Sequence, residues 1–423
     1  MKVIKKNKVL LIISLLYFTI VSIFIYYPIP NFQDYLPHLI NHPHADWTGI
    51  VDANRCLLNG YNVYLNNPCD FGNRLYTYGR ILLFLPFVNE FKFFYYNIVP
   101  NLTNFLFIFV SLKIFQPAKL TEYIILFFIL ISQPFILAME RANIDLLIFI
   151  FIFIIAYYNK NYLNQVIITI ITLIKFYPIT LVSIFLFLDK VRNKIFNIAL
   201  FLLLISVFLF IQKNDIISIF NSFTIDKSLH TPGLNSFNFS FYLMPKIFSV
   251  VLEKINYSNK FSQSLLYTIY FLLSFLIFII NYIYINKKKF FYDFNFDNFN
   301  ERLYFIGSII AVSCYFLLNN HLYKEIFLII LLPYLYKNSI KNDWHYFYYL
   351  KILIYCKFFI PSFLSLLKIF FYLEIDYLKG LNILIKSSLD NVLLILLFSN
   401  LVFILIMQLK KLKTPRKFLS EGP

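Results

Sequence analysis

The densest group of reactive side chains in the sequence lies between residues 34 and 80. It includes three aspartates, Asp34, Asp46 and Asp52, and it ends in a run of tyrosine, glycine and arginine. An aspartate beside a bound hydroxyl can act as a general base. An aspartate at the start of a helix can instead be an N-cap or a surface charge. The residue types alone leave these readings open for each of the three.

Two cations, Arg141 and Lys175, lie near the ends of long apolar runs. An ionisable side chain at such a depth is costly, so it indicates a functional site. Phosphate is a suitable ligand for both, because charge-assisted contacts to its oxygens are strong. Arg141 could instead pair with Glu140 or Asp145, or extend to lipid head groups. A proline at position 178 interrupts the chain after Lys175 and frees backbone groups, which is common at membrane sites.

His321 and Lys324 form another polar group late in the chain. A histidine can be a base, a donor or a buried hydrogen-bonding group. Three further histidines, His38, His42 and His44, stand close together, and the first two have the i, i+4 spacing that can hold a metal ion on a helix. Prolines beside that pair disfavour a regular helix. We therefore expect a solvated loop there, with no metal site and no cofactor.

The four cysteines fall into two kinds. Cys56 and Cys69 share the polar segment, and a disulfide between them is possible if the compartment is oxidising. Cys314 and Cys356 lie in apolar runs, where we expect buried thiols that pack as small apolar side chains.

The composition indicates that these side chains are held in place by helices embedded in lipid. Of the 423 residues, 60% are hydrophobic and 14% are charged, whereas soluble domains carry about 25% charged residues. The mean hydropathy is +0.70. These values exclude an ordinary soluble enzyme, a disordered chain and a nucleic-acid-binding domain. The formal net charge of +17 is attributed to basic loops held at anionic lipid.

Apolar runs of about 20 residues predict membrane-spanning helices. The candidates cover about 9–28, 94–115, 121–139, 144–158, 163–174, 179–188, 195–212, 263–285, 303–318, 325–336, 346–372 and 391–409. They make twelve crossings, or eleven or fewer if the two short runs around Lys175 form one re-entrant element. No small-residue cleavage site follows the first run, so it is interpreted as a helix and not as a signal peptide. The predicted fold is one all-α polytopic membrane domain over residues 1–423, with about 10–12 transmembrane helices.

The distribution of basic residues predicts the orientation. Under the twelve-crossing interpretation, the inner segments hold more than half of the 38 Lys and Arg residues, as the positive-inside rule requires. Both termini are then cytoplasmic, and two large segments, 29–80 and 213–262, lie outside. Long outer loops are often functional. The second contains an amphipathic stretch, Phe241 to Ile255, that could lie on the membrane surface.

The first outer segment carries a recognisable order of residues. Asp46 is followed fourteen residues later by Gly60-x-x-x-Tyr64, and then by Tyr76-x-Tyr78 before an apolar run that contains proline. This order resembles the membrane glycosyltransferases of the GT-C type. It is most similar to the polyprenol-phosphate-mannose-dependent mannosyltransferases of glycosyltransferase family 87.

Three later segments are similar to motifs of the same family. Residues 140–147 resemble its Gly-x-x-Asn-x-Leu-Leu segment, residues 175–178 its Lys-x-x-Pro segment, and residues 319–325 its polar, aromatic turn before a late helix. The resemblance covers about residues 1–340. There are two departures: the family's Tyr-Pro-Pro is Tyr78-Gly79-Arg80 here, and its glycine before the asparagine is replaced by Arg141-Ala142.

The resemblance implies an inverting glycosyltransferase, a hexosyltransferase of the mannosyltransferase type. It would move a sugar from a polyprenyl-phosphate-linked donor to a glycolipid or glycan acceptor at the outer face of the cell membrane. A lipid-linked donor suits that face, because nucleotide sugars are normally absent there. The departing phosphate has a second pKa of about 6 and leaves readily as an anion. The reaction therefore needs a base for the acceptor, but no general acid.

The resemblance also assigns roles to residues. Asp46 is the expected base, because its spacing to Gly60 matches the family's pattern, whereas Asp52 and Asp34 lack that match. The expected donor-phosphate ligands are Arg141, Lys175 and Lys324, and the expected supporting residues are Asn143, Tyr177 and His321.

Two other classes of membrane protein remain open. A transporter or flippase of lipid-linked oligosaccharides often has matched broken helices in two halves of the chain, whereas only one Lys-x-x-Pro break is evident here. A polysaccharide polymerase or ligase also uses lipid-linked sugars and outer loops. The acidic loop directly after the first span favours the glycosyltransferase over both.

Overall fold

The computed structural model describes residues 2–26, 43–117, 119–188, 191–218, 238–239, 241, 263–317, 320–339, 344–370 and 376–413. This part of the chain is almost entirely helical. Its helices are α1 (Lys2–Tyr26), α2 (Ala45–Leu58), η2 (Arg80–Leu83), η3 (Phe94–Ile98), α3 (Val99–Phe115), α4 (Leu120–Leu130), α5 (Gln133–Glu140), α6 (Ile144–Tyr158), α7 (Asn161–Ile174), η4 (Tyr177–Phe187), α8 (Val191–Ile211), α11 (Gln263–Lys288), α12 (Phe299–Leu317), η6 (Leu322–Leu331), α13 (Leu332–Asn338), α14 (Trp344–Phe370) and α15 (Asp376–Lys413).

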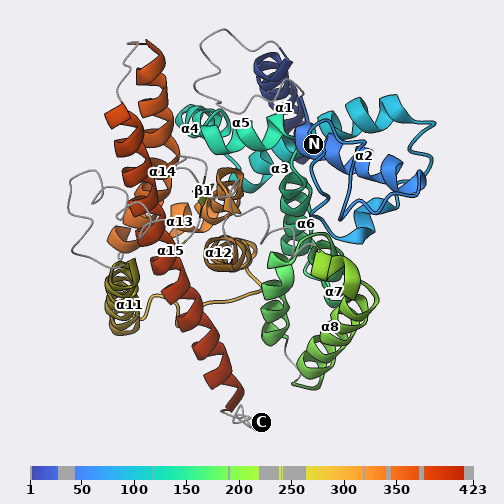
Figure 1. Cartoon of the computed structure of the whole chain (residues 1–423). Helices are drawn as coiled ribbons and strands as arrows, with labels where there is room; N and C mark the ends of the chain where they lie inside the picture. The colour runs from blue at the N-terminus through green and yellow to red at the C-terminus, as the bar shows by residue number, and fades with distance from the viewer. Residues whose placement is uncertain are drawn as a thin grey trace.

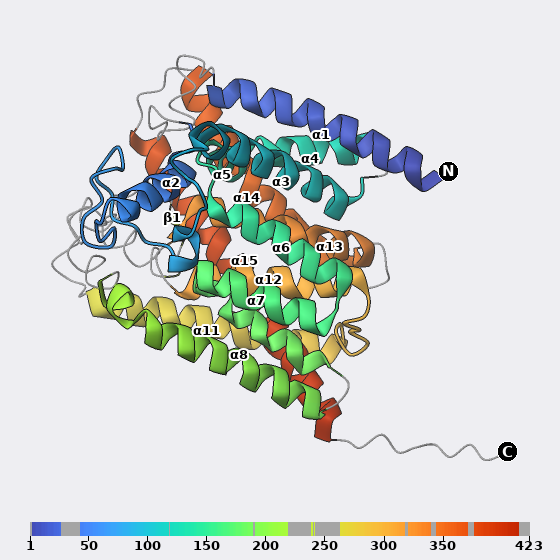
Figure 2. The same cartoon turned by 90° about the vertical axis from the view of Figure 1, so that its right-hand side faces the viewer.

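The helices form one layered body around a shared apolar core. Figure 1 shows α2, α7 and α8 on one side of the molecule and α11, α14 and α15 on the other, with α12 between them. α12 packs against α6, η4, η6 and α15, so it joins the two sides. In Figure 2, α2 lies at one end of the body, and the first residues of α1 and the last of α15 lie toward the opposite end.

Four of the described helices are long and apolar enough to cross a membrane, namely Phe94–Phe115, Arg192–Ile211, Ser264–Lys288 and Leu384–Lys410. A fifth span is possible if α4 and α5 act together across a bend of 58°. The protein is thus an all-helical membrane protein. The finer prediction of 10–12 crossings stays a prediction, because α6, α7 and η4 have 15, 14 and 11 residues, fewer than the roughly 20 that a span needs.

Several predicted spans differ in detail from the helices. The run 121–139 is broken into α4 and α5, because Pro134 starts a new helix and lacks the amide hydrogen that would continue the first one. The run 325–336 is the 3₁₀ helix η6 followed by α13. The run 391–409 extends toward the N-terminus to Asp376 in α15, and so includes Lys386 and Asp390 as buried helical residues.

The predicted break around Lys175 is confirmed. α7 ends at Ile174, and Lys175 follows in an extended conformation with φ −143° and ψ 144°. η4 then begins at Tyr177, with Pro178 in its first turn, where a missing amide hydrogen costs nothing. The break turns the Lys175 side chain away from the helical path and into the interior.

The segment 29–80, which is predicted to lie outside, packs its described residues against the end of the helical body (Figure 2). Residues 29–42 lie outside the described part; the rest holds α2 and a chain of turns. Cys56 and Cys69 are joined by a disulfide, as the sequence allowed. Gly79 passes so close to the end of α7 that a Cβ atom there would lie 1.7 Å from the carbonyl oxygen of Leu173. Only glycine fits at that crossing.

Most of the second large segment, 213–262, lies outside the described residues, including the amphipathic stretch after Phe241. A short antiparallel pair joins β1 (Asn238–Phe239) to β2 (Asn320–His321). The Phe241 ring packs 5.0 Å from the ring of Phe316, measured between centroids. The described residues Asn238 and Phe239 therefore lie beside the start of η6.

The first prediction tests the orientation of the chain. Asn62 and Lys288 are both exposed, and in Figure 2 the turns after α2 and the end of α11 lie toward opposite ends of the body. In intact cells, a cysteine introduced at Asn62 should react with an impermeant thiol reagent. A cysteine introduced at Lys288 should react only after the membrane is opened. Reaction of the Asn62→Cys variant from the cytoplasmic side alone would contradict the predicted topology and the outer location of α2.

Candidate active site

The N-terminus of α2 is attached to the turn between α5 and α6. The backbone N–H of His44 donates to the carbonyl of Glu140 at 2.6 Å, and that of Asp46 donates to the carbonyl of Arg141 at 3.1 Å. The N-cap position belongs to His44, and no side chain caps the helix. The Asp46 carboxylate is therefore not used as an N-cap, and the turn fixes where it points.

The Asp46 side chain binds the same turn. Its Oδ1 accepts hydrogen bonds from Arg141 Nε at 2.9 Å and Nη2 at 2.5 Å. Its Oδ2 accepts a hydrogen bond from the Asn143 amide. The side chains of Arg141 and Asp46 are 19% and 9% exposed, so the pair is mostly buried and keeps a small contact with water. Arg141 thus pairs with neither Glu140 nor Asp145.

Asn143 connects this ion pair with a second one. It is the N-cap of α6, and its Oδ1 accepts from the backbone N–H of Asp145 at 2.9 Å. The same oxygen lies 3.4 Å from Lys175 Nζ. Ala142, just before it, has φ 42°, a left-handed conformation that glycine adopts more easily.

Asp145 is the centre of the second ion pair. Its Oδ1 lies 2.9 Å from Lys175 Nζ and accepts the Tyr177 hydroxyl at 2.8 Å. Its Oδ2 lies 3.8 Å from Lys324 Nζ. The Asp145 side chain is fully buried, and that of Lys175 is 14% exposed. One carboxylate therefore holds two ammonium groups in place.

Tyrosine rings surround the two ammonium groups. Lys175 Nζ lies 5.2 Å from the ring centre of Tyr78 and 5.8 Å from that of Tyr323. Lys324 Nζ lies 3.8 Å from the ring centre of Tyr177. Each ammonium group is therefore within cation–π distance of a tyrosine ring. Tyr78 reaches its place because Gly79 allows the close crossing with α7.

The cluster has an excess of positive charge. Arg141, Lys175 and Lys324 carry three positive charges, and Asp46 and Asp145 carry two negative ones. Among these five side chains one positive charge is left over, in a largely buried setting where charges interact strongly. The neighbouring carboxyl group of Glu140 is also buried, and its oxygens accept no hydrogen bond from the described residues. An anion is thus the ligand that the cluster would favour.

The pKa of Asp46 follows from its neighbours. Burial by itself would raise the pKa, but the charge of Arg141 and the hydrogen bonds from Arg141 and Asn143 outweigh it, and the pKa falls from 3.8 to about 2. Because the folded-state pKa is lowered, the Asp46 contacts contribute stability above about pH 4, which is lost as the pH falls toward 2.

The lowered pKa of Asp46 gives a second prediction. The midpoint of thermal unfolding of wild type should exceed that of Asp46→Asn by a constant amount between about pH 5 and 8, and the gap should narrow below about pH 4. The measurement is thermal unfolding of both proteins in detergent across that range. If the difference between the two unfolding midpoints disappeared already at pH 6, the pKa of the Asp46 carboxyl group would be raised and not lowered.

Most residues that the sequence assigned to the site come together. Asp46, Arg141, Asn143, Lys175, Tyr177 and Lys324 all belong to the cluster. His321 lies in β2, where its backbone pairs with Asn238; its side chain lies outside the described part. Asp145, Tyr78 and Tyr323 were missed as site residues.

The remaining candidates lie elsewhere. Asp52 accepts a hydrogen bond from the Tyr96 hydroxyl and lies 3.5 Å from Arg55 Nη1, so it belongs to a separate group on α2. Asp34, His38 and His42 lie outside the described residues, whereas His44 is buried. Within the described ranges, no three His, Cys, Asp or Glu side chains are grouped as a metal ion requires.

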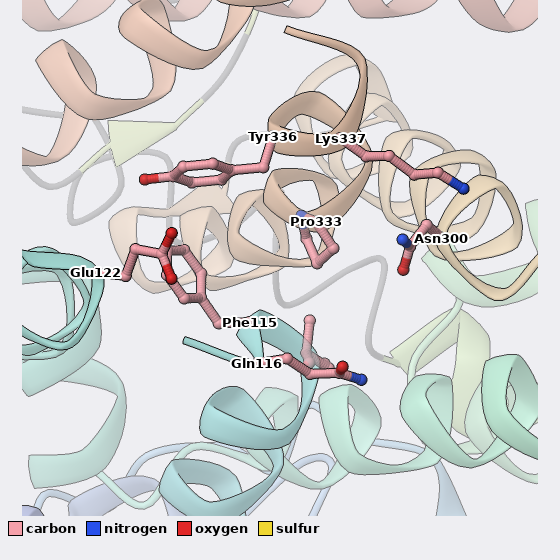
Figure 3. Close-up of a pocket in the computed structure, with 8 residues that line it drawn as sticks. Phe115, Gln116, Glu122, Asn300, Pro333, Tyr336 and Lys337 are labelled. Atoms are coloured by element: carbon pink, nitrogen blue, oxygen red, sulfur yellow. The ribbon is translucent and has the colours of Figure 1, made fainter. Parts of the chain in front are cut away.

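A surface cavity of about 280 Å³ lies at the other end of the helices. Its lining includes Phe115, the last residue of α3, and Asn300, near the start of α12. Figure 3 shows Glu122 and Tyr336 on one side of Pro333, and Asn300 on the other. The Asp46 cluster is found at the opposite helix ends, beside the start of α6. This cavity therefore takes no part in the candidate active site.

No family model matches this chain, and no curated protein matches it. The fold and the cluster define an all-helical membrane protein with paired carboxylates and cations where several helices end.

Proposed function

We propose that the protein is an inverting glycosyltransferase of the cell membrane. It transfers a sugar, in the manner of a mannosyltransferase, from a polyprenyl-phosphate-linked donor to a glycolipid or glycan acceptor on the outer face. The observation that carries the proposal is the meeting of Asp46 with Arg141, Lys175 and Lys324 in one cluster. These residues come from four separate parts of the chain, and together they offer a base and three cations.

The reaction is a single displacement. The acceptor oxygen forms a bond to the anomeric carbon, and the bond from that carbon to the phosphate oxygen breaks with its electron pair on the phosphate. The acceptor proton passes to Asp46. Attack from the side opposite the leaving group inverts the anomeric configuration. The departing phosphate is a stable anion, and Arg141, Lys175 and Lys324 stabilise its charge.

The present ion pairs explain how the donor would prepare the base. A phosphate that binds Arg141 competes with Asp46 for the guanidinium, and one that binds Lys175 competes with Asp145. Loss of the Arg141 contact removes the largest influence that lowers the Asp46 pKa, so the carboxylate becomes a stronger base. A stronger base accepts the acceptor proton more readily. Donor binding thus precedes, and makes possible, proton removal from the acceptor.

The test is a transfer assay with purified protein in nanodiscs. Undecaprenyl phosphate linked to mannose, glucose or galactose is supplied with a membrane lipid extract as acceptor, and released undecaprenyl phosphate and a new glycolipid are measured together. Equal amounts of both, with inverted configuration, are expected. A product that grows by successive sugar units would favour a polymerase or ligase. Movement of the lipid-linked sugar across the bilayer without any transfer would favour a transporter.

A further inference from the structure

A second buried group of charges lies directly behind Lys324. Lys357 Nζ on α14 lies 2.9 Å from Glu325 Oε1 on η6 and 2.6 Å from Asp390 Oδ1 on α15. Lys386 Nζ, also on α15, lies 3.7 Å from Glu325 Oε1. Each of these four side chains is at most 3% exposed. Two cations and two anions balance, so the group is neutral as a whole.

Neighbouring residues on η6 connect the two buried groups. In a 3₁₀ helix, consecutive side chains point about 120° apart. Lys324 reaches Asp145 on α6, on one side of η6. Glu325 reaches α14 and α15, on the other side. A rotation or shift of η6 that breaks the Glu325 contacts therefore also moves Lys324 relative to Asp145.

η6 is also held in place by close packing against α12. A Cβ atom at Gly307 of α12 would lie 3.0 Å from side-chain atoms of Ile330 and Leu331. α12 thus lies against the far end of η6, while the charged group holds its first turn. Figure 1 shows α14 and α15 on the side of the molecule away from α2, with α12 between the two sides.

We propose that Glu325, Lys357, Lys386 and Asp390 are positioning residues that hold Lys324 at the donor phosphate. The inference rests on the proposed function, because it takes Lys324 as a phosphate ligand. A buried ion pair is in general weak evidence for stability. This group instead fixes the position of Lys324. Glu325 is the next residue after Lys324, and its partners lie on two other helices, α14 and α15. Loss of one partner would leave an unpaired buried charge and let η6 relax.

The test measures binding of undecaprenyl phosphate, without sugar, to the full chain in nanodiscs. Lys324→Met should weaken binding about tenfold, which corresponds to about 1.4 kcal/mol. Lys357→Met should weaken it by a similar factor, and Lys357→Arg should restore most of it. The double variant should bind no more weakly than Lys324→Met alone, because both changes remove the same contact. Lys351→Met, on the same helix and 4.5 Å from the ring centre of Tyr336, is the matched control and should bind normally.

The outcomes separate the inference from the proposed function. Equal binding by wild type and Lys324→Met would remove Lys324 from the phosphate site, and the inference with it. A large effect of Lys324→Met with no effect of Lys357→Met would overturn the inference alone. A double variant in which the two losses of binding affinity multiply would also overturn the inference alone. If Lys357→Met does not fold, Lys386→Met removes the longest contact to Glu325 and is measured in its place, with the same expectation.

Discussion

Asp46→Asn should lower sugar transfer at least about a hundredfold, since a general base contributes typically 10²–10⁴-fold. Asparagine keeps the shape of the side chain and can still accept a hydrogen bond from Arg141, but it cannot take the acceptor proton. The measurement is the initial rate of transfer with saturating donor and acceptor. Binding of the donor should survive, because Arg141, Lys175 and Lys324 remain.

Asp52→Asn is the matched control for this experiment. Asp52 lies on the same helix, but its partners are Arg55 and Tyr96, not the cluster. Its removal should change transfer only mildly. Thermal unfolding of both variants separates a lost base from lost stability, because Asp46→Asn leaves the Arg141 charge without its anion. Normal transfer by Asp46→Asn with loss in Asp52→Asn would place the base six residues further on. Normal transfer by both would exclude a carboxylate base on α2.

The resemblance assigned most of the candidate residues, and two of them also lie at positions with a local signal in the sequence. An asparagine before an apolar run is a good helix start, and Asn143 is the N-cap of α6. A lysine three residues before a proline marked the break at which Lys175 leaves the helix. These features depend on a few neighbouring residues, so they can be read without knowledge of the tertiary fold.

Contacts between distant residues could not be predicted in the same way. Asp145 and Lys175 are 30 residues apart, and no periodic pattern connects them. Lys386 and Asp390 interrupt an apolar run, so the last span was expected to begin after them. In the fold they are buried because Lys357 and Glu325, on other helices, supply opposite charges. The crossing at Gly79 depends on where α7 ends in space, which the sequence alone does not show.

The second large effect is expected on donor binding. Lys175→Met should weaken binding of undecaprenyl phosphate about tenfold to a hundredfold, because a hydrogen bond to a charged group contributes about 1.5–3 kcal/mol. Methionine matches the length and apolar stem of lysine, so it removes the ammonium group and little else. Arg141→Met and Lys324→Met should each weaken binding as well. Unchanged donor affinity in all three single variants would exclude this cluster as the phosphate site.

Lys160→Met is the matched control, since Lys160 is exposed just before the other end of α7. It makes the same chemical change at the opposite end of α7 from Lys175 and should leave donor binding intact. Lys175→Met should lower both the donor affinity and the rate at saturating donor, because the same ammonium group binds the phosphate and stabilises its charge as it departs. A lysine that only supports the fold through Asp145 would instead lower thermal stability, with donor affinity per folded molecule unchanged. A comparison of the loss of donor affinity with the loss of thermal stability therefore distinguishes a phosphate ligand from a structural ion pair.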